Sequence, residues 1–150
     1  MMATQISTLH VLLSTFIHAP AVRVWDEFTS FQRFAAWFGQ GHSLETYEPE
    51  LGGSVRLSVN VDGANRFFGG TILGFEAACE LTFSNNWESS GWPVPTFITL
   101  QLTSLYDSTL VELFHHGFDR LGAAAGSELQ GYEAGWHSRH LENLKKIVEA

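Results

Sequence analysis

The chain has 150 residues, the size of one domain, and a domain of this length buries roughly 68–70% of the surface of its unfolded chain. Its 16 acidic and 8 basic residues give a formal net charge of −8 at pH 7. Nucleic acids and anionic membranes bind through clustered lysine and arginine, so neither is expected as a partner.

Apolar residues make up 45% of the chain, and 12 of them are Phe against only 3 Tyr. Phe has no polar atom and belongs in a core or an apolar pocket. The single cysteine, Cys79, excludes an internal disulfide and is expected to be a small buried residue. The N-terminus lacks a basic stretch leading into a signal peptide, and no apolar run approaches the ~18 residues of a membrane span. We therefore expect a soluble cytoplasmic protein.

The first predicted elements are a strand over residues 5–18 and two short helices that follow Pro20. Apolar residues alternate along the strand, and proline then suits the first turn of a helix. Thr29 and Gln32 have the spacing of a capping box for the second helix, which Gly39 ends. Aromatic residues are so dense in these helices that the helices must cover an apolar surface.

From residue 42 to 118 the apolar residues recur with a period of two, which is typical of half-buried antiparallel strands. Asp62-Gly63 is a hairpin signal, and a second tight turn is expected at Asp107-Ser108. Gly69-Gly70 interrupts one strand and indicates a bulge or a bend there. Connections this short indicate a meander of about six strands.

The last stretch predicts one long helix over residues 127–148. Ser127 and Gln130 have capping-box spacing, and apolar residues then follow every three or four positions. Gly131 and Gly135 each cost about 1 kcal/mol relative to Ala inside a helix. They suggest a close approach to another surface, or room beside a large ring.

The predicted fold class is therefore α+β, in a single domain over residues 1–150. A curved antiparallel sheet of about seven strands has one apolar face to cover, and the terminal helix is the only element long enough to cover it. A curved sheet under one helix would leave a cavity, closed at one end by the short helices.

Several short motifs occur in this order. They are Ala19-Pro20, Val24-Trp25, Trp37-Phe38-Gly39, Gly52-Gly53, Gly70 opening GTILGFE, Leu81-Thr82-Phe83, Thr109, His115-His116-Gly117-Phe118, Gly135-Trp136, and Leu141, Leu144, Lys145 and Lys146. Together they resemble the helix-grip superfamily of START-like domains, also called SRPBCC or birch-pollen-allergen-like. Within it, the sequence is most similar to the branch of the C-terminal domain of the activator of the heat shock protein 90 ATPase.

This resemblance covers about residues 8–149 and implies a helix-grip fold in the order β-α-α-β6-α. It does not specify a reaction, because the superfamily includes lipid carriers, hormone receptors, aromatic cyclases and co-chaperone domains. The chaperone activator also has an N-terminal domain that is not part of this sequence.

His115, Tyr132 and His140 are candidates for acid–base chemistry. His115 shares a strand face with apolar residues, and His140 lies one turn beyond Trp136 on the apolar face of the last helix. Two cavity histidines with a tyrosine could form a general acid–base set. The alternative, which we favour, is that they are hydrogen-bonded core residues.

No metal or other cofactor is predicted. His115 and His116 are adjacent on a strand and point to opposite faces, so they cannot chelate together. His137 and His140 could share a metal on a helix, but no third ligand lies at metal spacing. We interpret them as a surface pair.

The aromatic residues are the strongest signal, and they predict either an apolar ligand pocket or a solid aromatic core. The residues expected to line the cavity are Trp25, Phe28, Phe31, Trp37, Phe38, Leu57, Val59, Phe83, Trp87, His115, Phe118, Tyr132, Trp136 and His140. We expect a non-catalytic domain that binds a small hydrophobic or aromatic molecule, or a protein partner such as a chaperone. A cyclase- or hydrolase-like enzyme and a co-chaperone-like module are the alternatives, and both monomer and homodimer stay open.

Overall fold

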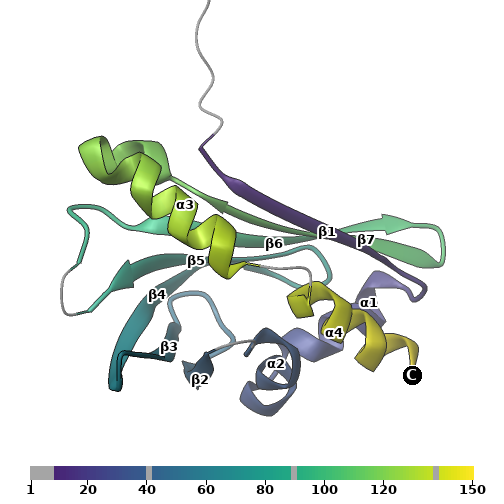
Figure 1. The fold of residues 1–150 in the computed structure, drawn as a ribbon. Coiled ribbons are helices and arrows are strands. Elements are labelled where there is room, and N and C mark those ends of the chain that lie inside the picture. Colours follow the sequence, from purple (N-terminus) through teal and green to yellow (C-terminus); the bar gives the residue numbers. More distant parts are fainter. Residues whose placement is uncertain (1–8, 40–41, 89–90, 137–138) are drawn as a thin grey trace, which may run out of the picture.

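The computed structural model describes residues 9–39, 42–88, 91–136 and 139–150. One curved sheet holds seven strands in the order β1-β7-β6-β5-β4-β3-β2, and every neighbouring pair is antiparallel (Figure 1). The strands are β1 Val11–Ile17, β2 Ser43–Tyr47, β3 Ser54–Val61, β4 Ala64–Glu76, β5 Glu80–Trp87, β6 Thr96–Leu105 and β7 Ser108–His116. The predicted α+β class and the antiparallel sheet are confirmed.

The helical elements follow the predicted order with one exception, at the C-terminal end. They are α1 Ala21–Trp25, the 3-10 helix η1 Asp26–Phe28, α2 Phe31–Phe38, the 3-10 helix η2 Phe118–Ala124, α3 Ala125–Gly135 and α4 Arg139–Glu149. In Figure 1, α1, α2 and α4 gather at one end of the sheet, and α3 lies towards the other end.

The short helices carry the chain from one edge strand, β1, to the other, β2. Two hydrogen bonds fix η1 between them: the Trp37 indole donates to the Glu27 carbonyl oxygen at 3.1 Å, and the Tyr47 hydroxyl donates to the Phe28 carbonyl oxygen at 2.6 Å. The buried Glu27 carboxylate lies 2.9 Å from both the Arg23 and Arg33 guanidinium groups. The segment is thus fixed by polar bonds as well as by its aromatic rings.

The N-cap of α2 differs from the prediction. Ser30, not Thr29, has the extended backbone of an N-cap, and its hydroxyl accepts a hydrogen bond from the Arg33 backbone N–H at 3.2 Å. The Thr29 hydroxyl instead donates to the Asp26 carbonyl oxygen at 2.7 Å. Both residues can cap helices, and the extra turn of η1 moves the start of α2 by one position.

The strand region has the predicted hairpin but not the predicted bulge. Asp62 and Gly63 both have positive φ, as the tight turn between β3 and β4 requires. β3 and β4 pair without a shift through Gly69 and Gly70, so the bulge is wrong as an interpretation of these glycines, and the alternative of a bend stays a prediction. The register shift lies between Ile72 and Gly74, against β5.

The single C-terminal helix predicted over residues 127–148 is only partly present. α3 ends at Gly135, and Trp136 has an extended backbone with ψ 132°, so α3 and α4 are separate helices. Ser127 does not cap α3, which already begins at Ala125; its hydroxyl donates to the Ala124 carbonyl oxygen at 3.2 Å. The prediction failed because the apolar spacing continues across the break.

Two apolar clusters correspond to the two C-terminal helices. α4 is strongly amphipathic and buries Leu141, Leu144 and Val148 in the main core, against α1, α2 and β1. α3 is weakly amphipathic and joins a small second cluster around Phe118 and Leu121 of η2. The helix predicted to cover the sheet therefore covers it in two separate parts.

Two further predictions concern Cys79 and membrane-spanning helices. Cys79 is exposed in the turn between β4 and β5, so the prediction of a buried cysteine is wrong. None of the helices in the described ranges is long and apolar enough to cross a membrane.

Replacing Gly131 by Ala should stabilise the protein. A Cβ atom at Gly131 would meet nothing within 4 Å, so the residue adjoins open space rather than a closely packed surface. We expect G131A to raise the free energy of unfolding by about 0.5–1 kcal/mol, measured by urea denaturation.

The matched control is Gly53→Ala, because a Cβ atom at Gly53 would overlap the Glu48 backbone oxygen. This variant should lose about 1–3 kcal/mol. A stabilised G53A, or a destabilised G131A, would contradict the packing described here.

Candidate functional site

A group of buried polar side chains lies where the two apolar clusters meet. Asn85 on β5, Thr96 on β6 and His115 on β7 are each 0% exposed. Tyr132 of α3 and Trp136 close this group from the helical side through hydrogen bonds. Polar groups removed from water need partners, so their bonding pattern indicates what the site can do.

The hydrogen bonds of His115 define its tautomer. The Trp136 indole N–H donates to Nδ1 at 2.9 Å, so Nδ1 must be unprotonated. Nε2 then carries the hydrogen and donates to the Thr96 hydroxyl oxygen at 2.8 Å. The Thr96 hydroxyl in turn donates to the Asn85 backbone carbonyl at 3.3 Å. Both ring nitrogens of His115 are therefore occupied.

His115 is consequently held in the neutral state. Burial, together with a smaller contribution from the charge of neighbouring His116, lowers its pKa from 6.5 to about 3. Protonation of Nδ1 would also place two N–H donors against each other at the Trp136 bond. A general base works best with a pKa near the working pH, so His115 is a hydrogen-bonded core residue rather than a base.

Asn85 has a side-chain atom for which the described residues supply no partner. Its Nδ2 donates to the Tyr132 hydroxyl at 3.2 Å, but the buried Oδ1 atom makes no hydrogen bond. This orientation leaves one buried polar atom of Asn85 unsatisfied, at a cost of about 1–3 kcal/mol.

Tyr132 forms the wall between this polar group and the surface. Its ring lies edge-on to His115, with centroids 4.6 Å apart, and packs against Trp92 at 5.9 Å. Burial raises the pKa of the Tyr132 hydroxyl far above its usual range, so the hydroxyl stays protonated.

The structure brings several predicted site residues together around Trp136. Its ring lies 6.0 Å from His115, 4.9 Å from His140 and 6.1 Å from Phe38, and Phe118 packs on His115 at 4.6 Å. Trp136 therefore contacts both of the histidines that were candidates for a joint acid–base role.

The remaining predicted residues have other positions. Trp25 and Trp37 both pack on Phe28 in the helical end of the core, with ring centroids 4.9 and 5.2 Å from that of Phe28. Phe31 is 37% exposed on α2. The residues on the inner side of the sheet are Leu57 and Phe83, which are buried, and Val59 and Trp87, which are half-buried.

A surface pocket of about 340 Å³ adjoins this site and contains residues that the sequence did not single out. It is lined by Val61, Arg66, Trp87, Trp92 and Glu128. Only Trp87 was predicted. Trp92 lies in a loop with two prolines, where no periodicity assigns it to a face, although a tryptophan in a loop was an available signal.

The metal prediction stays a prediction. Among the residues that the structure describes, no group of three or more His, Cys, Asp or Glu side chains could hold a metal ion. His137 lies outside the described residues. The opposite orientation of His115 and His116 is confirmed, because His115 is fully buried and His116 is half-buried on the other face.

Comparison with known proteins identifies the family. Residues 18–149 match the family model described as activator of Hsp90 ATPase homolog 1-like protein. The chain belongs to this family. The resemblance expected from the motifs is thereby confirmed, and no curated protein matches the chain.

Solved structures show that this family member shares its fold with other proteins. A protein of Chromobacterium violaceum has a TM-score of 0.71 at 18% identity, over 96% of this chain and 99% of that one. One from Arthrobacter aurescens has a TM-score of 0.72 at 19% identity, over 98% and 90%. DynU16, from the dynemicin biosynthetic locus, has a TM-score of 0.67 at 22% identity, over 96% and 48%. These similarities show the fold alone.

The stability of this protein should fall in mild acid because of His115. The unfolded state binds a proton near pH 6.5, whereas folded His115 stays neutral down to about pH 3. Stability is therefore lost as the pH falls through this window, by about 2 kcal/mol between pH 7 and pH 5. Urea denaturation at both pH values measures it.

The variant His115→Gln should lack this component of the pH dependence, because glutamine does not titrate. His18→Gln, which removes an exposed histidine, is the control and should keep it. The same loss of stability between pH 7 and pH 5 in H115Q and the parent would show that His115 titrates normally.

Proposed function

We propose that this protein binds a small, planar and largely apolar molecule at the α3 end of the sheet, in the pocket formed by Trp87 and Trp92. The observation that carries the proposal is the unsatisfied Oδ1 atom of Asn85, which is buried behind Tyr132. A buried acceptor among aromatic rings is the arrangement that orients an apolar ligand through one donor group.

The dimensions and walls of the pocket support a small aromatic ligand. Its volume of about 340 Å³ lies at the lower end of the range for small-molecule sites. Two indole rings provide apolar surface, and Arg66 and Glu128 bring charged groups to it. Tyr132 stands between the pocket and Asn85, so a shift of the Tyr132 ring would give a ligand access to Oδ1.

The division of the C-terminal helix supports such a shift. The extended backbone at Trp136 separates α3 from α4, and α3 packs mainly on η2. A ligand that enters under α3 would therefore disturb the small second cluster but not the main core that α4 anchors. With one continuous helix, a displacement of α3 would also have moved α4 and the main core.

The structure favours binding over catalysis. Both nitrogens of His115 are occupied, and its pKa of about 3 keeps it neutral and unsuited to proton transfer near pH 7. Trp136 packs against both His115 and His140, and its indole occupies Nδ1 of His115. We therefore propose a non-catalytic domain over the enzyme alternative.

A matched pair of probes tests the role of Asn85. 2-Naphthol carries a hydroxyl donor, whereas 2-methylnaphthalene has nearly the same shape without one. We expect the parent protein to bind 2-naphthol about tenfold more tightly, measured by tryptophan fluorescence. Asn85→Leu should remove this preference and leave the affinity for 2-methylnaphthalene within about twofold, since only the acceptor is lost.

Trp87→Ala should weaken the binding of both 2-naphthol and 2-methylnaphthalene, because it removes one wall of the pocket. Tyr106→Ala is the control: it removes a fully exposed aromatic residue in the β6–β7 turn and should change neither affinity. If neither probe binds the parent protein, the carrier proposal fails. The alternative of a domain that binds a protein partner, such as a chaperone, would then be preferred.

A further inference from the structure

A second pocket of about 360 Å³ lies on the opposite face of the sheet. It is lined by Leu9, His10, Phe97, Phe114, His116, Gly117, Asp119 and Arg120. Positions 114 and 116 alternate with the buried Leu113 and His115, so their side chains lie on the opposite face of the sheet from those two residues. The pocket is thus separated from the proposed ligand site by the sheet itself.

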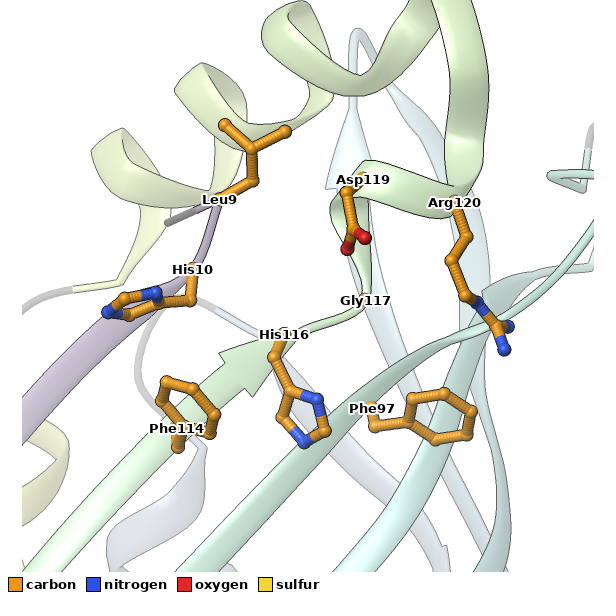
Figure 2. Close-up of a pocket in the computed structure, with 8 residues that line it drawn as sticks. All are labelled: Leu9, His10, Phe97, Phe114, His116, Gly117, Asp119 and Arg120. Carbon is orange, nitrogen blue, oxygen red and sulfur yellow. The ribbon is translucent and has the colours of Figure 1, made fainter. Parts of the chain in front are cut away.

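Aromatic rings form its floor. Figure 2 shows a row of rings made by His10, just before β1, by Phe114 and His116 on β7, and by Phe97 on β6. Ring centroids are 4.8 Å apart for His10 and Phe114, 4.7 Å for Phe114 and His116, and 5.7 Å for Phe97 and His116. The outer face of a sheet usually carries polar side chains, so a continuous row of rings indicates a surface for a flat ligand.

Charged side chains lie over the row of aromatic rings because the chain turns back after the end of β7. Gly117 has φ 95°, a conformation that suits glycine, and η2 then places Asp119 and Arg120 over the rings (Figure 2). The Arg120 guanidinium lies 5.1 Å from the centre of the Phe97 ring and donates to the Pro95 carbonyl oxygen at 2.9 Å. The contact with Pro95 holds the guanidinium beside the pocket and uses one of its five donors.

Three basic groups face this pocket against one acidic group. The groups around His116 are His10, which directly precedes β1, Asp119 and Arg120 of η2, and the Thr99 hydroxyl of β6 at 3.4 Å. Burial lowers the pKa of His116, the charge of His10 lowers it further, and Asp119 opposes both. An anion bound beside His116 would favour its protonated form and so gain a second positive partner.

We propose that this outer pocket binds a planar aromatic carboxylate. The ring lies on Phe97, Phe114 and His116, and the carboxylate interacts with Arg120 and with His116, which takes up a proton on binding. Rings on one side and basic groups at the rim select a ligand that is both flat and anionic. This site is distinct from the neutral-ligand site under α3, and the inference does not depend on it.

The experiment compares 2-naphthoate with its neutral isostere 2-naphthamide by NMR titration of the whole protein. We expect 2-naphthoate to bind about tenfold more tightly at pH 6 and to shift the resonances of His10, Phe114 and His116. Its affinity should rise as the pH falls from 8 to 6, because neutral His116 becomes charged in the complex.

Variants show which residues cause the preference for 2-naphthoate over 2-naphthamide. Arg120→Gln should weaken the binding of 2-naphthoate about fivefold and that of 2-naphthamide less than twofold, since it removes the positive charge of the guanidinium. His116→Gln should abolish the pH dependence, and its fold is checked by circular dichroism. Arg66→Gln, an arginine at the other pocket, is the control and should change neither affinity.

Three outcomes would overturn the proposal, and the first two use only the parent protein. They are equal affinity for 2-naphthoate and 2-naphthamide, resonance shifts at Trp87 and Trp92 in place of the outer residues, and unchanged 2-naphthoate binding in both R120Q and H116Q. Failure of the naphthol test at the α3 site would leave these results unaffected.

Discussion

The hydrogen bond from the Trp136 indole to Nδ1 of His115 is the interaction on which the helical side of this domain depends. It joins the end of α3 to β7 and fixes the tautomer of a fully buried imidazole. To make it, Trp136 has an extended backbone, which ends α3 and begins a separate helix beyond it. The polar group, the helix break and the boundary between the two apolar clusters thus meet at one contact.

The sheet could be predicted from the sequence because its signal is local. Apolar residues alternate along each strand, and positive-φ turns such as Asp62-Gly63 mark the connections. The helix break could not be predicted in this way. Tyr132, Trp136 and His140 have helical spacing whether or not the helix continues, and the bond that ends it reaches a strand residue 21 positions away. A periodic pattern carries no information about such a contact.

The candidate site was predictable only in part, for a related physical reason. The aromatic residues around Trp136 were found because large rings are conspicuous in a sequence. Asn85 was missed, although the alternation of Leu81 and Phe83 already places it on the buried face. A polar residue at an inward position in a regular strand was therefore the available signal. What could not be predicted is that one end of its amide lacks a partner, since this depends on where Tyr132 of α3 places its hydroxyl.

Adjacent residues on β7 show how the same side chain acquires different properties on the two faces of a sheet. His115 is buried between the Trp136 indole N–H and the Thr96 hydroxyl, and its low pKa excludes a charged imidazole near neutral pH. His116 is half-buried, its pKa is lowered by burial and by His10 but raised by Asp119, and its ring stacks on Phe114 within reach of solvent. Alternation in a strand forces this division, because no rotation of the backbone can place both rings on one side. The inner histidine can therefore order the core while the outer one stays available to a charged ligand.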